Sequence, residues 1–324
     1  MIRIGIIGSG KIVKKFLTQV QTCKDIKISC MYSRTLTTAQ DFAKTYQIEH
    51  STNDMKTMIE HIDAVYIASP NGLHFSQAKF FLENNIHVLV EKTITFTVQE
   101  AQQLITLAKN KSLILLEAFI SVHLPIFTQL KTLVDKTQPR IINLNFNRTS
   151  SRMSDVEKGI YISVFDKELG KGSTYDALIY PLQLVLYLVG KIINVKAVTN
   201  KLPNGVSISN HVILTHKNNT ITTINCSKGV TSYAPSEFIG DDSSIILDTV
   251  HPLKQIKYYT KNGIKIINDD ANSIASMTFE ILEFVKMIKQ KDFISRDYWL
   301  NHSLMHLQVI EAIIKSQNET GVVV

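Results

Sequence analysis

Apolar residues follow two different rhythms along the chain. Over the first 116 residues, short apolar runs alternate with segments that have helical spacing. The runs cover residues 2–7, 26–32, 64–68, 87–90 and 113–116. Short continuous apolar runs are typical of parallel strands that are covered on both faces. The pattern therefore predicts a βαβ series, which folds as an α/β Rossmann domain with a doubly wound parallel sheet.

Helix start signals lie between these strands. Thr38-x-x-Asp41, Ser51-x-x-Asp54 and Thr97-x-x-Glu100 each place a capping residue three positions before an acid. Such spacing is typical of the first turn of a helix. We therefore expect helices to begin at these three places.

The second rhythm begins after Glu117, where apolar and polar residues alternate singly. We expect strands at 141–147, 195–199, 206–215, 220–226, 244–247, 256–260 and 264–267, with Asn-Gly turns at 204–205 and 262–263. Helical spacing marks 125–134, 173–188, 276–289 and 298–316. The sequence thus predicts two domains: a Rossmann domain at 1–118, and an α+β domain at 119–324 with a large open, mainly antiparallel sheet.

Composition narrows the class of protein. The chain has 324 residues, of which 44% are hydrophobic and 19% charged, as in globular proteins. No apolar stretch is long enough to span a membrane, and the first strand leaves no room for a signal peptide. Three cysteines without Cys-x-x-Cys spacing indicate free thiols in a cytoplasmic protein. The net charge of +7 comes from scattered lysines, so we expect no nucleic-acid partner.

The first glycine turn is a candidate phosphate site. After the strand at 2–7 come Gly8, Ser9, Gly10, Lys11 and Ile12, and helical spacing follows. Such a turn brings backbone N–H groups and the positive end of a helix dipole against a pyrophosphate. The third fingerprint position carries Val instead of Gly or Ala. A glycine turn that holds no ligand is the alternative, so the turn needs support from other positions.

Three further groups follow predicted strands. They are Ser33-Arg34, the segment from Ser69 to His74, and Glu91-Lys92. Because ligands bind beyond the carboxyl ends of parallel strands, we expect these groups at one edge. NAD sites place an acid after the second strand, but no carboxylate occurs at 32–35. Since arginine can pair with a 2′-phosphate, Arg34 favours NADP, while dual specificity and a surface role for Arg34 stay open.

Several short motifs, in order along essentially the whole chain, resemble one known family. They are Gly5-Ile-Ile-Gly-Ser-Gly10-Lys-Ile, Ser33-Arg34, Ser69-Pro-Asn-Gly-Leu-His74, Val90-Glu-Lys92, Glu117-Ala-Phe119, Leu169-Gly-Lys-Gly172 with Asp176 and Tyr180, and Phe279-Glu-Ile-Leu-Glu-Phe284. The chain resembles the glucose-fructose oxidoreductase / inositol dehydrogenase / MocA (Gfo/Idh/MocA) family. The resemblance implies NAD(P)-dependent oxidoreduction of sugars, polyols or diols, and homodimers or homotetramers joined through the second domain's sheet.

The resemblance also implies roles for particular residues. Lys92 matches the lysine of the family's Glu-Lys-Pro motif, where a cation can stabilise alkoxide charge. Tyr180 matches the acid/base position in the branch that resembles dihydrodiol and D-xylose dehydrogenases. A phenol has an ordinary pKa near 10, so it needs a neighbouring cation, and Lys92 is the candidate. Asp176 would hold a substrate hydroxyl or orient Lys92. Asn71 and His74 would contact the cofactor or shape its pocket.

Three positions depart from the family pattern. Thr93 replaces the proline, which frees φ and concerns the rigidity of the turn. Lys171 stands between two glycines and places a cation where many relatives have none. Val122 stands where relatives often carry arginine, which leaves open a less polar or smaller substrate. His302 and His306 have the i, i+4 spacing of a metal site, but no third ligand is near in sequence, so we expect no metal. A non-catalytic sensor is the alternative function, although it would not need Lys92, Asp176 and Tyr180 together.

Overall fold

The computed structural model describes residues 1–20, 23–268 and 276–317, and its chain forms two compact units. One unit contains Met1–Ile120 and Ile274–Leu304, and the other contains Ser121–Ser273 and Met305–Val324. Helix α11 (Ser276–Gln290) therefore belongs to the first unit, and helix α12 (Phe293–Ser316) contributes to both. This differs from a division at residue 118, which places both helices in the second domain.

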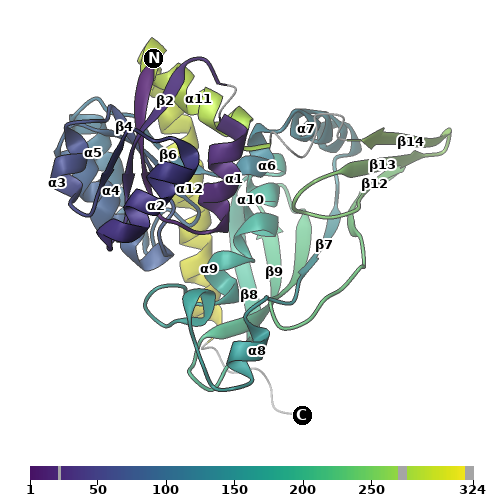
Figure 1. The fold of residues 1–324 in the computed structure, drawn as a ribbon. Helices are drawn as coiled ribbons and strands as arrows, with labels where there is room; N and C mark the ends of the chain where they lie inside the picture. Colours follow the sequence, from purple (N-terminus) through teal and green to yellow (C-terminus); the bar gives the residue numbers. More distant parts are fainter. Residues whose placement is uncertain (21–22, 269–275, 318–324) are drawn as a thin grey trace. The chain divides into compact units, whose positions relative to one another are not determined.

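The first unit is built on a six-stranded parallel sheet, as the apolar runs predict (Figure 1). Its strand order is β3-β2-β1-β4-β5-β6, the order of the doubly wound dinucleotide-binding fold. The strands are β1 (Ile2–Ile7), β2 (Ile26–Tyr32), β3 (His50–Thr52), β4 (Ala64–Ile67), β5 (His87–Glu91) and β6 (Leu115–Ala118). The helices between them are α1 (Lys11–Val20), α2 (Leu36–Tyr46), α3 (Met55–Ile59), α4 (His74–Glu83) and α5 (Val98–Asn110).

Helix α1 is held in the core of this unit by its apolar side. Val13 is fully buried, so the valine at the third fingerprint position takes part in the packing. Phe16 stacks on Tyr66 of β4 with ring centroids 4.1 Å apart. Ile281 and Phe284 of α11 belong to the same core, and α11 packs against α1. The core therefore fixes where α1 begins relative to the end of β1.

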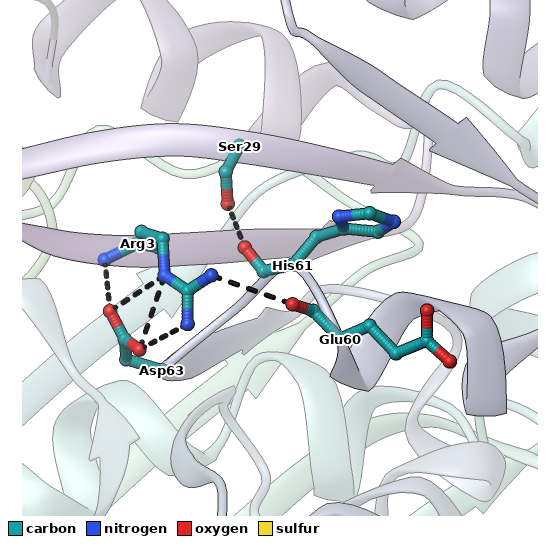
Figure 2. Close-up of polar contacts among 5 residues, drawn as sticks. All are labelled: Arg3, Ser29, Glu60, His61 and Asp63. Atoms are coloured by element: carbon teal, nitrogen blue, oxygen red, sulfur yellow. Dashed lines mark hydrogen bonds and ion pairs between the residues drawn. The ribbon is translucent and has the colours of Figure 1, made fainter.

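A group of hydrogen bonds lies at the amino-terminal ends of the strands of the same sheet (Figure 2). The backbone N–H of Arg3 and its guanidinium both donate to the Asp63 carboxylate, at 2.7–3.2 Å. The guanidinium also reaches the Glu60 carbonyl, and Ser29 Oγ donates to the His61 carbonyl at 2.8 Å. These contacts join β1 and β2 to the loop that precedes β4. The glycine turn lies at the other, carboxyl end of β1.

The second unit is built on an eight-stranded sheet, which is mainly antiparallel as predicted. Its order is β14-β13-β12-β11-β7-β10-β9-β8, and only β7 and β10 pair in parallel among the strands described. The strands are β7 (Ile141–Asn147), β8 (Ile192–Lys201), β9 (Ser207–His216), β10 (Ile221–Ser227), β11 (Ser236–Ile239), β12 (Ser243–Leu247), β13 (Gln255–Thr260) and β14 (Gly263–Asn268). One face is covered by helices, including α7 (Pro125–Thr137) and α10 (Ile179–Leu188).

One expected helix is divided in two. The spacing at 173–188 predicts a continuous helix, but the structure has α9 (Ser173–Asp176) and then α10. Pro181 has no N–H to donate to the Ala177 carbonyl, which instead accepts from the Tyr180 N–H at 3.2 Å. The continuous helix assumed by the i, i+4 argument was therefore wrong, although Asp176 and Tyr180 still line one cavity.

Two helix starts were misplaced and one was correct. Helix α2 begins at Leu36, after Thr35, rather than at Thr38. Ser51 lies in the short strand β3, and Asp54 caps α3 by accepting from the Lys56 N–H. At Thr97 the predicted capping box is present, because Thr97 and Glu100 each accept from the other's backbone N–H.

Strands β3 and β11 were not predicted, because strands of three and four residues are too short to show a sequence period.

No helix within residues 1–20, 23–268 and 276–317 is long and apolar enough to cross a membrane.

Candidate functional site

The glycine turn has the geometry of a phosphate cradle. It connects the end of β1 to Lys11, the first residue of α1. Gly8 has a φ of +112°, and a Cβ there would lie 2.4 Å from the Ala68 carbonyl oxygen. A Cβ on Gly10 would meet no heavy atom within 4 Å, and both Ser9 and Gly10 are exposed. Open space therefore lies where a pyrophosphate would meet the helix N-terminus, and these residues fit a dinucleotide.

Ser33 and Arg34 follow β2 on the same sheet. The backbone N–H of Ser33 donates to the Thr52 carbonyl at 3.2 Å, which anchors the end of β2 to β3. The Arg34 side chain is exposed. Because β1 and β2 are parallel neighbours, Arg34 and the glycine turn follow the carboxyl ends of adjacent strands. Their arrangement suits a ligand that carries more than one phosphate.

His74 ties two of the loops at this edge together. It is fully buried, and its Nδ1 and Nε2 lie 2.9 Å from the Thr93 and Ser69 carbonyl oxygens, respectively. Burial is the main reason that the pKa of His74 is lowered, with nearby Lys92 acting in the same direction. The Ser69 hydroxyl donates to Gln77 at 2.7 Å. His74 thus positions the Lys92 loop, whereas cofactor contact by His74, Ser69 and Asn71 stays a prediction.

Glu91 and Lys92 stand at the end of β5. The Tyr66 hydroxyl donates to Glu91 Oε1 at 2.5 Å, and Lys92 is half-buried. Burial raises the pKa of Glu91, although the bond from Tyr66 and the charge of Lys92 oppose it. The peptide bond from Lys92 to Thr93 is cis, and Thr93 is buried.

A second carboxyl group near Glu91 was not singled out from the sequence. Glu280 of α11 is fully buried, and neither of its oxygens has a hydrogen-bond partner among the described residues. Burial and the charge of Glu91 raise the pKa of Glu280 well above its usual value. Glu280 was part of a quoted family motif, but the sequence alone does not indicate that its side chain is buried.

Tyr180 lines a cavity in the second unit. The cavity has a volume of about 180 Å³, and its lining comprises Phe146, Arg148, Asp176, Ala177, Tyr180, Ser227, Lys228 and His251. The Tyr180 ring stacks on the His251 ring with centroids 4.1 Å apart. Ser121 Oγ lies 3.0 Å from His251 Nδ1, which fixes the imidazole from its other side. The phenol is therefore held in one orientation at the cavity wall.

Asp176 lines the same cavity and pairs with Lys228 of the second unit. Both side chains are less than one-third exposed, so the pair is stronger than a typical surface ion pair. Sequence reasoning missed Lys228, Arg148 and His251, which lie far from Tyr180 along the chain. The predicted roles of Lys92, Asp176 and Tyr180 stay predictions.

The departures at Lys171 and Val122 both lie in the second unit. Gly172 has a φ of +80°, and a Cβ there would lie 2.1 Å from the Ser207 carbonyl oxygen. The preceding Lys171 has its Nζ 6.0 Å from the centre of the Tyr175 ring, and it does not line the Tyr180 cavity. Val122 is buried. Lys171 itself has a φ of +55°, in the left-handed region that residues other than glycine seldom occupy.

His302 and His306 of α12, which have the spacing of metal ligands in the sequence, contact other side chains. His306 is buried, with its Nδ1 2.8 Å from Gln183 Nε2, and the His302 ring packs against Tyr298 at 4.8 Å. In the part of the chain that the structure describes, no three His, Cys, Asp or Glu side chains form a group that could hold a metal ion.

A six-stranded parallel sheet of this order with an open glycine turn after its first strand is the arrangement of a dinucleotide-binding domain. Comparison with known proteins identifies the chain as an NAD(P)-dependent oxidoreductase. The model described as "Oxidoreductase family, NAD-binding Rossmann fold" matches residues 2–119, and the GFO/IDH/MocA C-terminal domain matches residues 138–247. The chain belongs to the Gfo/Idh/MocA family.

Individual relatives agree with this assignment. The NADP(+) scyllo-inositol 2-dehydrogenase IolU of Bacillus subtilis is 31% identical over 326 residues, which cover 100% of this chain and 98% of the relative. Trans-1,2-dihydrobenzene-1,2-diol dehydrogenase of Xenopus tropicalis is 26% identical, over 56% of this chain and 54% of its own. The 3-ketoreductase KijD10 of Actinomadura kijaniata, solved with NADP and TDP-benzene, shares the fold with a TM-score of 0.83 at 18% identity, and 97% of each chain is covered.

Proposed function

We propose that this oxidoreductase prefers NADP and transfers hydride between the nicotinamide and an alcohol or carbonyl carbon of a sugar, polyol or diol. The observation that carries the cofactor preference is the exposed Arg34 after β2, in a segment without a carboxylate at 32–35. An arginine there suits a 2′-phosphate. The substrate class is supported by the relatives, which act on an inositol and on dihydrodiols by name.

The chain's own residues would orient the substrate and move its proton. When bound, the nicotinamide supplies the hydride acceptor or donor. Tyr180 would take the proton of the substrate hydroxyl in oxidation and return it in reduction. Lys92 would stabilise negative charge on the substrate oxygen. Asp176 would accept a hydrogen bond from a second hydroxyl, held in place by Lys228.

The test of this function is a panel of aldoses, inositols and vicinal diols, followed by nicotinamide absorbance with NADP⁺. We expect at least one member to be oxidised, and Tyr180→Phe to slow that reaction by a factor of about 10²–10⁴, the usual contribution of an acid/base group. Tyr175→Phe is the matched control, because Tyr175 is a buried tyrosine that does not line the cavity. Equal rates for Tyr180→Phe and the wild-type protein would refute the proposed role.

The cofactor preference has a separate test. We expect Arg34→Ala to weaken NADPH binding by at least about tenfold, which corresponds to about 1.4 kcal/mol, and to leave NADH binding nearly unchanged. Tighter binding of NADH than of NADPH by the wild-type protein, with a ratio that Arg34→Ala does not change, would show that the assignment is wrong.

We also propose that the chain forms a homodimer or homotetramer through the sheet of the second unit. On the face of that sheet turned away from its buried residues, Ile141, Val198, Ile213 and Ile221 are 45–68% exposed. The register places Ile221 opposite Ile141, and these four side chains share one face. An apolar stripe over four strands is typical of an interface. We expect Ile213→Lys to lower the molecular mass measured by light scattering.

A further inference from the structure

We propose that the substrate carries an anionic group, a carboxylate or a phosphate, which Arg148 binds at the Tyr180 cavity. This inference rests on the proposed function, because it assigns the substrate class of the same site. The observation behind it is the positive charge of the cavity lining, which the proposed hydride transfer does not require.

The sheet brings two cations to one place. Strands β7 and β10 are parallel neighbours with Asn147 opposite Ser227, so Arg148 and Lys228 are the first residues beyond the two carboxyl ends. The Arg148 N–H donates to the Ser227 carbonyl at 2.9 Å, which holds the two strand ends together. Both side chains line the cavity. Two positive charges therefore lie side by side next to Tyr180.

Among the described residues that line the cavity, Asp176 is the one carboxylate, and it already forms an ion pair. Its partner in this pair is Lys228. Arg148 forms no ion pair with any residue in 1–20, 23–268 or 276–317, and its side chain donates a single hydrogen bond, from Nη2 to Thr249 Oγ1 at 3.0 Å. The cavity thus keeps one net positive charge, and Arg148 retains donors for a ligand.

The exposed Arg148 side chain also has two neighbours that limit its freedom. The guanidinium carbon lies 5.1 Å from the centre of the Phe146 ring, and the bond to Thr249 fixes one end of the fork. A planar fork that is already oriented binds carboxylate and phosphate oxygens in pairs with little loss of side-chain freedom. A cavity of about 180 Å³ is smaller than a complete ligand pocket, for which roughly 300–1,000 Å³ is usual. It therefore takes the part of the substrate that bears the anionic group.

The experiment compares substrates that differ only in this group, in the holoprotein with NADP⁺. Each aldose in the panel is offered as the neutral sugar, as the acid oxidised at its terminal carbon, and as the ester phosphorylated at that carbon. Each inositol, which has no terminal carbon, is offered as the neutral polyol and as its monophosphate. We expect the acid or the phosphate to have a kcat/KM at least about tenfold above the neutral form, and the better of the two identifies the natural group.

Arg148→Gln should reduce this preference at least about tenfold, mainly through KM, and Arg148→Lys should restore part of it. Arg140→Gln is the matched control: Arg140 is an exposed arginine just before β7, paired with Asp241, and its loss should leave the preference unchanged. Preference for the neutral form, or an equal effect of Arg148→Gln on all forms, would overturn the inference while leaving the proposed oxidoreduction intact. If no form is oxidised, both fail.

Discussion

Replacing Gly8 with alanine tests the cradle at its most constrained position. The φ of +112° is unfavourable for any residue with a Cβ, and the added carbon would lie 2.4 Å from the Ala68 carbonyl oxygen, which is fixed in the backbone beyond β4. Backbone strain of this kind costs about 1–3 kcal/mol. Overpacking adds about 1–3 kcal/mol, so we expect a total loss of about 2–6 kcal/mol.

Gly10→Ala is the matched control in the same turn. The added carbon would meet no heavy atom within 4 Å, and the backbone there does not require glycine. Gly10 is the N-cap of α1, where alanine is less favourable, so the free energy of unfolding should fall by no more than about 1 kcal/mol. NADPH binding should nevertheless weaken at least about tenfold, because the carbon occupies the open space assigned to the pyrophosphate.

The assay is urea unfolding followed by circular dichroism, together with NADPH titration followed by its fluorescence. The predicted outcome separates the two variants: Gly8→Ala loses about 2–6 kcal/mol of stability, and Gly10→Ala loses mainly cofactor affinity. A Gly8→Ala protein as stable as the wild type would refute the argument from geometry. Undiminished NADPH affinity in Gly10→Ala would refute the position of the cradle.

Further predictions concern titration and capping in the first unit. Because burial raises the pKa of Glu280 above 4.5, its contribution to stability is lost as pH rises above that value, so Glu280→Gln should gain stability over the wild type between pH 4 and 7 in thermal melts. A constant difference would contradict this. Burial lowers the pKa of His87 to about 4, and the Nδ1 of His87 accepts the Ile114 N–H. The free energy of unfolding should therefore fall as the pH drops from 6.5 to 4, and His87→Gln should reduce this fall. An equally steep fall in His87→Gln would contradict the prediction. Thr97→Ala should cost about 1 kcal/mol in urea unfolding by removing the capping box with Glu100, and Thr18→Ala, at an exposed position of α1, is its control.

The strands of the two sheets could be predicted, because each sheet has one characteristic pattern of apolar residues along the sequence. The five longer apolar runs of the first 118 residues became β1, β2, β4, β5 and β6, and the alternating runs after residue 140 became the open sheet. Strand β3 has only three residues, and Pro181 interrupts a helical pattern that is otherwise intact. The pairing of β3 with β2 depends on a neighbour in space, which a period does not record. The break before Pro181 is local and could have been read from the sequence, because proline has no N–H with which to continue a helix.

The residues of the candidate site likewise fall into those that the sequence could place and those that it could not. Gly8, Gly10, Arg34 and Lys92 follow predicted strands, so the fold class alone places them near one edge. Arg148 and Lys228 are 80 residues apart, and only the register of β7 against β10 brings them together. A basic residue one or two positions beyond each of two predicted strands, at 141–147 and 220–226, was the available signal, but it has no meaning until the strands are known to be parallel neighbours.

The most direct test of the central claim is a double-mutant cycle on oxidation of the best panel substrate with NADP⁺. We measure kcat/KM for the wild type, Lys92→Ala, Tyr180→Phe and the double variant. If both residues serve one proton-transfer step, each single variant loses about 10²–10⁴ and the double variant loses little more than the worse single one. Single variants that turn over at the wild-type rate would contradict the account, and so would losses that simply multiply in the double variant.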